Sequence, residues 1–261
     1  MPKIMLKADQ LNEINANYSH SRLRQPLFLN SVPKCGSHLM RNIMRLFVPF
    51  DQHYRNTFIQ FPTLKQDKVA WDKNKPTLSW GHLLFSDESC LFLKNAKQVV
   101  LVRDPYDWVL ARARFFMSDE FQGSIDHLKG GRVDTTELLN MMIFGIHMKV
   151  PMLKEIFMHN GASWVGTKAH VVKYEDLIHN LKNINTKEGE GFFINLLGKC
   201  GIEPIPDDWK KRVLEGADRK HSGTARENLS GNTVEIPKEL PDAQKKLVDF
   251  AAPGLRTLLG Y

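Results

Sequence analysis

The sequence predicts an α/β fold built around a mostly parallel sheet, and two patterns support this. Short apolar runs typical of buried strands lie at 27–31, 98–102 and 170–174. The stretches that follow the first two carry apolar residues at helical spacing. Strands that alternate with helices form right-handed βαβ units, in which neighbouring strands run parallel.

The first unit begins with Leu27 to Ser31 (LFLNS), a short strand that ends before Pro33 and Gly36. Beyond this loop, apolar residues recur every three or four positions, which predicts a helix. The residues that define it are Leu39, Ile43, Leu46 and Phe47.

The second unit begins with Gln98 to Val102 (QVVLV), a β-branched run expected for a strand buried on both faces. It ends at Arg103-Asp104-Pro105, and a helix is expected from Tyr106 to Met117. The pattern predicts a longer helix from Thr135 to Val150 and a third strand from His170 to Tyr174.

A chain of 261 residues with 42% hydrophobic composition is long enough for one large domain with its own core. We expect a single domain over residues 1–261. The segments near 51–76, 119–133 and 180–190 are polar and aperiodic, so they are expected to be long loop insertions. Loops of that length often bind or cover a ligand.

Charge and composition limit the classes of partner. The net charge of +7 favours anionic ligands. The densest basic run, 210–212, is expected on a surface helix, so nucleic acid is not the expected partner. There is no apolar run of about 18 residues and no signal-peptide pattern, so we expect a cytoplasmic protein with no membrane association.

The three cysteines are widely spaced and form no C-x-x-C pair. They suggest neither a disulfide framework nor a metal site.

The loop after the first strand has the features of an anion site. A loop that leaves a buried strand and opens a helix directs backbone N–H groups and the positive end of the helix at one point. Lys34, Gly36, Ser37 and His38 occupy it. An ATP-binding Walker A loop is poorly supported, because that motif places its lysine directly after its second glycine.

Two segments together resemble a known family. Pro33-Lys34-Cys35-Gly36-Ser37-His38-Leu39 is similar to the P-K-S-G-T-T-W phosphosulfate loop of sulfotransferases that use 3'-phosphoadenosine-5'-phosphosulfate (PAPS). Arg103-Asp104-Pro105-Tyr106-Asp107 resembles the R-[DN]-P-x-D start of that family's 3'-phosphate motif. The order and the structural context of the two segments agree.

Further matches extend the resemblance over roughly residues 27–261. Trp80 to Leu83 resembles the segment with the family's catalytic histidine, and Lys173 to Leu177 resembles its Y-E-D-L segment. Ser222 to Arg226 is similar to the segment that supplies a second arginine, and Gly254 to Tyr261 resembles the end of bacterial members. The resemblance implies a P-loop-like sulfotransferase fold, a three-layer sandwich around the sheet.

The resemblance also implies roles. Lys34 would stabilise charge on the bridging oxygen, and His82 would take the proton of an acceptor hydroxyl. The acceptor would be a small molecule or peptide, no metal would be needed, and the protein could form a homodimer. The residues expected to bind the donor are Lys34, Cys35, Gly36, Ser37, His38, Leu39, Arg103, Ala111, Tyr174, Arg226, Glu227 and Asn228.

The sequence departs from the family at the adenosine end of the site. Ala111 stands where the family has a serine for the 3'-phosphate, and Leu39 stands where it has an aromatic residue against adenine. The family's R-K-G pattern reads Arg226-Glu227-Asn228. Arg112, Arg114 or Ser118 could supply the missing contact, and the sequence does not choose among them.

Two other functions remain open from the sequence. Cys35 and Arg41 satisfy C-x5-R, the anion loop of cysteine phosphatases, and a thiol beside Lys34 at a helix start is expected to have a lowered pKa. The chain could also be a non-catalytic module that binds a nucleotide through the same loop and arginines.

Overall fold

The central sheet has five strands, all parallel, in the order β3-β4-β2-β5-β7. This confirms the predicted mostly parallel α/β fold. The computed structural model describes residues 3–4, 9–119, 121–221 and 235–261. A separate antiparallel pair joins β1 to β6. The strands are β1 Lys3–Ile4, β2 Leu27–Ser31, β3 His53–Gln60, β4 Leu78–His82, β5 Lys97–Val102, β6 Phe121–Gln122 and β7 His170–Lys173.

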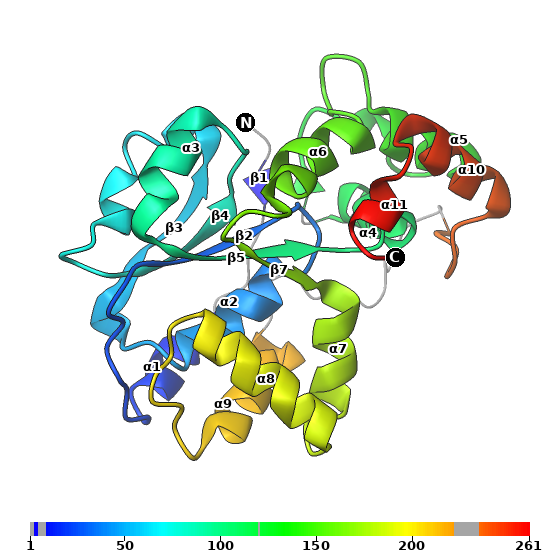
Figure 1. Ribbon diagram of the computed structural model, residues 1–261. Coiled ribbons are helices and arrows are strands. Elements are labelled where there is room, and N and C mark those ends of the chain that lie inside the picture. Colours follow the sequence, from blue (N-terminus) through cyan, green and yellow to red (C-terminus); the bar gives the residue numbers. More distant parts are fainter. Residues whose placement is uncertain (1–2, 5–8, 120, 222–234) are drawn as a thin grey trace.

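Helices cover both faces of this sheet, so the molecule has three layers (Figure 1). Helices α1, α2, α8 and α9 lie on one side, and α3 and α6 lie on the other. Among the described residues, no helix is both long and apolar enough to cross a membrane. The helices are α1 Leu11–Asn15, α2 Ser37–Arg45, α3 Asp87–Phe92, α4 Pro105–Met117, α5 Thr135–Phe144, α6 Leu153–Asn160, α7 Tyr174–Lys182, α8 Lys187–Lys199, α9 Trp209–Ala217, α10 Asp242–Ala251 and α11 Leu255–Leu258.

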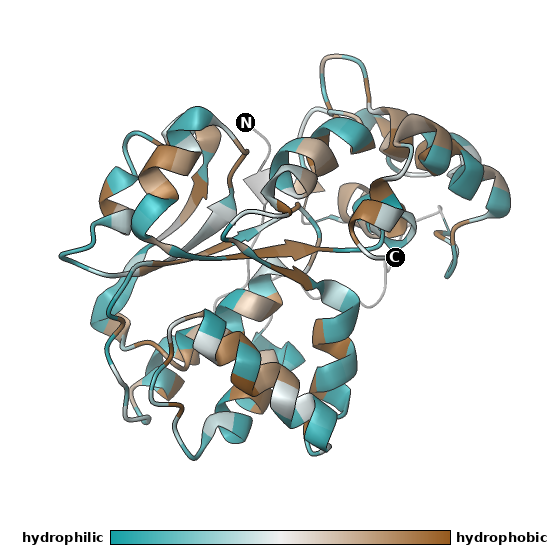
Figure 2. Ribbon diagram, in the orientation of Figure 1, coloured by the Kyte–Doolittle hydropathy of each residue, from teal (hydrophilic) through white to brown (hydrophobic). Residues whose placement is uncertain are grey.

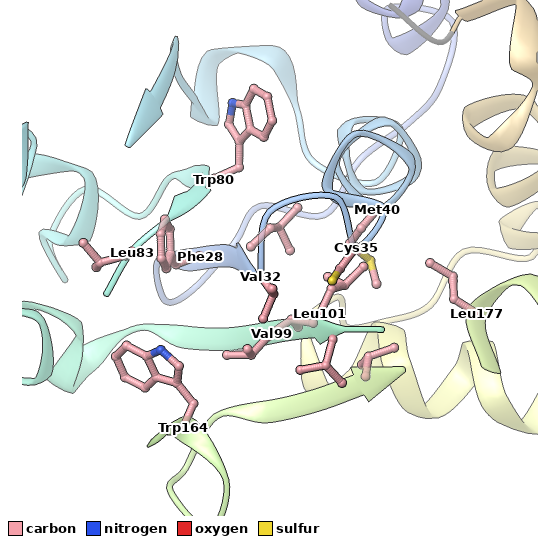
Figure 3. Packing of buried hydrophobic residues seen from close by; sticks show 14 of the residues in the cluster. Phe28, Val32, Cys35, Met40, Trp80, Leu83, Val99, Leu101, Trp164 and Leu177 are labelled. Carbon is pink, nitrogen blue, oxygen red and sulfur yellow. The ribbon is translucent and has the colours of Figure 1, made fainter. Parts of the chain in front are cut away.

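The apolar strands form the core because both of their faces are covered. Every residue of β2 is buried, and so is every residue of β5 after Lys97. Figure 2 shows most of β5 as hydrophobic, whereas the outer helices carry mixed faces. Side chains from the β2–α2 loop, including Val32 and Cys35, join the same buried cluster (Figure 3).

The register of the sheet brings the ends of four strands to one edge. Leu29 of β2 pairs with Trp80 of β4 and Val99 of β5, and Leu101 of β5 pairs with Val172 of β7. Because all four strands are parallel, the residues that follow them lie at the same carboxyl edge. In open α/β sheets ligands bind outside this edge, at the point where the strand order reverses.

Several element boundaries differ from the sequence-based expectations. The segment 51–76 is not a continuous loop, because it contains strand β3, and 180–190 is mostly helical, with a break only between Lys182 and Lys187. The helix expected over 135–150 ends at Phe144, since Gly145 has a φ of 81° and leaves the helical conformation.

Candidate functional site

The loop between β2 and α2 is shaped by two residues with left-handed backbone. Gly36 has a φ of 89°, and a Cβ at this position would lie 2.6 Å from Cδ2 of Tyr174. Glycine is therefore required both by its conformation and by the ring that packs against it. Helix α2 begins at Ser37, so the backbone N–H groups of its first turn have no partner within the helix and point toward the space beside the loop.

Lys34 also has a left-handed backbone, with a φ of 69°. This conformation costs a non-glycine residue roughly 1–3 kcal/mol and is found mainly where the surrounding structure enforces it, often at functional sites. The Nζ atom lies 3.3 Å from the centroid of the Phe115 ring. The charged amine is thus held at the carboxyl edge of the sheet, against an aromatic face.

His82 is the last residue of β4 and lies directly beside the end of β2. Its Nδ1 is 3.0 Å from the carbonyl oxygen of Ser31 and 2.9 Å from the Ser31 hydroxyl. A carbonyl oxygen can only accept, so Nδ1 carries the proton and Nε2 keeps its lone pair. Burial and the charge of Lys34 lower the pKa of His82 to about 3. The imidazole is therefore neutral at physiological pH, with Nε2 able to accept a proton.

Arg103 follows β5 and lies against the start of α7. Its guanidinium carbon is 4.7 Å from the centroid of the Tyr174 ring, and its Nε is 4.0 Å from Oε1 of Glu175. That Nε is buried, and no hydrogen-bond partner for it is found among the described residues. Because the Tyr174 ring also packs on Gly36, Arg103 and the anion loop form one continuous site.

Cys35 does not have the chemistry that the phosphatase interpretation requires. Its side chain is completely buried, and burial raises the pKa of the thiol well above its usual value. The sequence-based expectation of a lowered pKa is therefore wrong, because desolvation outweighs the nearby positive charges. Arg41 lies inside α2 with its guanidinium carbon 4.5 Å from the Trp80 ring, so it does not close a loop around a phosphate.

The three thiols should therefore differ sharply in reactivity. Cys90 is exposed, whereas Cys35 and Cys200 are buried. Since the thiolate is the reactive form, we expect Cys90 to react with a thiol reagent at pH 8 at least roughly 10-fold faster than the other two. Mass spectrometry of the native protein after timed alkylation measures this, and unfolding in urea should equalise the rates. Rapid labelling of native Cys35 would contradict its assignment as an inert core residue.

The remaining predicted residues are spread around this cluster. Ser37 is buried at the first position of α2, and the ring of His38 lies 5.0 Å from that of Trp80. Leu39 packs against the main core, and Ala111 lies partly exposed on α4. The segment 226–228 (Arg226, Glu227 and Asn228) lies outside the described residues.

Asn30 and Ser31 support the position of His82, and sequence patterns did not point to them. The Asn30 amide accepts from the backbone N–H of Leu83 at 2.8 Å and donates to its carbonyl oxygen at 3.1 Å. It thereby fixes the backbone directly after His82, while Ser31 fixes the ring itself. The available signal was a pair of polar residues at the end of an otherwise apolar strand.

The C-terminal segment supports the Arg103 side of the site. The Tyr261 hydroxyl donates to Oε2 of Glu175 at 2.7 Å, and the other oxygen of Glu175 accepts from the backbone N–H of Asp104 at 3.2 Å. Arg256 makes two hydrogen bonds to the Asp104 carboxylate, at 3.0 and 2.8 Å. These contacts fix the strand-to-helix turn that carries Arg103.

Two cavities, of about 560 and 400 Å³, lie away from this cluster, one beside α1 and the other between β7, α8 and α11. Neither is lined by Lys34, His82 or Arg103. Within the described part of the chain, no group of three or more His, Cys, Asp or Glu side chains could hold a metal ion.

Comparisons with known proteins agree with the architecture. No protein-family model matches the chain, and no curated protein matches it. Among solved structures, a mouse sulfotransferase complexed with PAP matches with a TM-score of 0.52 and 14% sequence identity, covering 98% of this chain and 94% of that one. The likeness extends over nearly the whole of both chains at low identity, so it concerns the fold. The chain therefore has a sulfotransferase-like fold, with Lys34, His82, Arg103 and Tyr174 gathered at the carboxyl edge of its sheet.

Proposed function

We propose that this protein is a PAPS-dependent sulfotransferase that transfers a sulfuryl group to an acceptor hydroxyl. One observation carries the proposal. A lysine in an anion loop, a neutral histidine beside it and an arginine with a buried Nε lie together at one sheet edge. This edge belongs to a fold that is shared with a sulfotransferase complexed with PAP. Lys34, His82 and Arg103 are therefore assigned to one reaction.

The donor would bind along the loop and the ends of β5 and β7. The loop amides and Ser37 hold the 5'-phosphosulfate, because N–H groups at a helix start favour an anion. Arg103 binds the 3'-phosphate with Arg226, since a guanidinium can donate two parallel charge-assisted bonds. The Tyr174 ring, already packed between Gly36 and Arg103, separates the two anionic ends.

The transfer step needs one base and one cation. The acceptor oxygen attacks sulfur, the bond between sulfur and the bridging oxygen breaks, and the electron pair stays on that oxygen of the departing adenosine 3',5'-bisphosphate (PAP). His82 Nε2 takes the acceptor proton, and Lys34 stabilises the charge on the bridging oxygen. Holding both reactants in line supplies much of the remaining rate enhancement.

The low pKa of His82 fits this role once the donor is considered. In the free protein, burial and the Lys34 charge together lower the pKa to about 3. A bound donor brings negative charge to the same place and offsets the positive charge of Lys34, which raises the pKa of the imidazole toward neutrality. The base therefore becomes stronger when the donor is present. The acceptor is a hydroxyl compound, either a small molecule or a peptide.

The donor class can be tested by ligand-dependent thermal stability. A ligand that binds only the folded state at 100 times its Kd stabilises it by about 2.7 kcal/mol. We expect PAP to raise the melting temperature, and AMP and ATP at equal concentration to raise it much less. Equal shifts for all three nucleotides would refute the donor assignment.

A transfer assay then separates the enzyme from a non-catalytic nucleotide-binding module. PAPS is incubated with a panel of phenols, alcohols, sugars and tyrosine peptides, and PAP release is measured. Selective PAP binding without transfer to any member of the panel would favour the binding module.

A further inference from the structure

The position of Ala111 leaves one side of the 3'-phosphate site without a polar side chain. Ala111 lies on α4, the helix that directly follows Arg103. Asp107 and Arg114 lie one turn before and one turn after it, so all three lie on the same side of the helix. The family resemblance would place a phosphate held by Arg103 on this side of α4, because the family's serine at position 111 holds the 3'-phosphate.

Two of the three residues that could replace the missing serine are committed elsewhere. Arg112 is only 3% exposed and donates to the carbonyl oxygens of Met142 and Pro151, at 2.8 and 2.7 Å. Ser118 is also buried, and its hydroxyl donates to the carbonyl oxygen of Phe115 at 2.7 Å. Both therefore stabilise the core and the end of α4.

Arg114 is the third and has a different environment. It is partly buried and uses Nη2 to donate to the carbonyl oxygen of Pro237 at 2.8 Å. Burial and the charge of Arg103 lower its pKa, whereas Asp107 partly compensates. The charge of Arg103 therefore acts on Arg114. Among the described residues the buried Nε of Arg103 has no hydrogen-bond partner, and Oε1 of Glu175 lies 4.0 Å from it. An anion bound between the two guanidinium groups would offset their mutual repulsion and accept a hydrogen bond from the Arg103 Nε.

We propose that Arg114, together with Arg103, binds the 3'-phosphate of the donor in place of the absent serine at position 111. The inference rests on the proposed function. Arg114 is three residues beyond Ala111, about 4.5 Å along the helix axis. Side chains on a helix lean toward its N-terminus, so a long arginine covers the surface above the preceding turn. Arg114 can thereby reach the place that a serine at 111 would serve.

The test compares the affinities of PAP and AMP for the wild type and for Arg114→Gln by isothermal titration calorimetry. A hydrogen bond to a charged group contributes about 1.5–3 kcal/mol, so PAP affinity should fall roughly 10- to 100-fold. AMP lacks the 3'-phosphate, and its affinity should change by less than about threefold. The matched control is Arg24→Gln, which removes the same charge from an exposed residue before β2, at the opposite edge of the sheet.

The outcomes separate the two proposals. A wild type that binds PAP no better than AMP refutes the proposed function. A wild type that prefers PAP, with the same preference in Arg114→Gln, overturns the Arg114 assignment alone. If Arg114→Gln does not fold, Arg114→Lys replaces it, because lysine keeps the charge and loses the planar fork. PAP affinity should then fall several-fold, and an unchanged affinity would equally overturn the assignment.

Discussion

Replacing Lys34 with alanine should lower the rate of sulfuryl transfer by roughly 10²-fold or more. The charged Nζ lies at the carboxyl edge of the sheet and acts electrostatically on His82. It is therefore placed to stabilise the negative charge that grows on the bridging oxygen. Single-turnover kinetics at saturating PAPS measure this step apart from donor binding.

Lys34→Met is the matched control for packing. Methionine keeps an apolar stem against Phe115 and loses only the charge, so it should be as slow as Lys34→Ala. Removing the charge should also raise the pKa of His82 above its value of about 3, because the Lys34 charge is one of the causes that lower it. An NMR titration of His82 gives this second readout. Full turnover in Lys34→Met would remove the lysine charge from the mechanism.

His82→Ala should also reduce transfer by roughly 10²-fold or more, which is the usual contribution of a positioned base. The effect should fall on the rate constant, and PAP affinity should stay within about threefold, since the base acts on the acceptor. His179→Ala is the control, because His179 is exposed near the end of α7. A His82→Ala enzyme with wild-type turnover would require a different base.

The lowered pKa of His82 predicts a pH-dependent stability. Its pKa is about 3 in the folded protein, below the ordinary 6.5, so the unfolded chain binds more protons between these values. His82 therefore lowers the free energy of unfolding as the pH falls below 6.5, by up to about 1.4 kcal/mol per pH unit. Urea unfolding at pH 7 and pH 5 measures this. Between these two pH values the free energy of unfolding should fall less in His82→Gln than in the wild type. Equal losses would contradict the depressed pKa.

The sequence predicted the apolar parts of the fold well because burial determines them. Strand β2 was predicted over its full length, and β5 and β7 were predicted to within one residue at either end. Strands β2 and β5 are buried on both faces, and the edge strand β7 still carries the apolar pair Val171 and Val172. Strand β3 (HYRNTFIQ) was missed, since it lies at the edge of the sheet and its sequence is polar.

The segment 180–190 was misread as a loop because its sequence is polar and aperiodic. Gly189 lies in the first turn of α8, where a Cβ would meet the carbonyl oxygen of Asn183 at 2.2 Å. Its backbone N–H is capped by the Thr186 hydroxyl at 3.1 Å. The glycine is therefore needed for close packing at the start of a helix, a requirement that only the neighbouring chain reveals.

The sequence by itself determined which residues could hold an anion and in what order they follow the strands: Lys34, His82, Arg103 and Tyr174. The tertiary structure alone decided their chemistry. It buries Cys35, which raises the pKa of its thiol, holds the His82 ring on Ser31 with its pKa at about 3, and brings the charge of Arg103 to act on Arg114. The reason is that pKa values and anion sites depend on burial and on distances across strands far apart in the chain, which local sequence patterns do not encode.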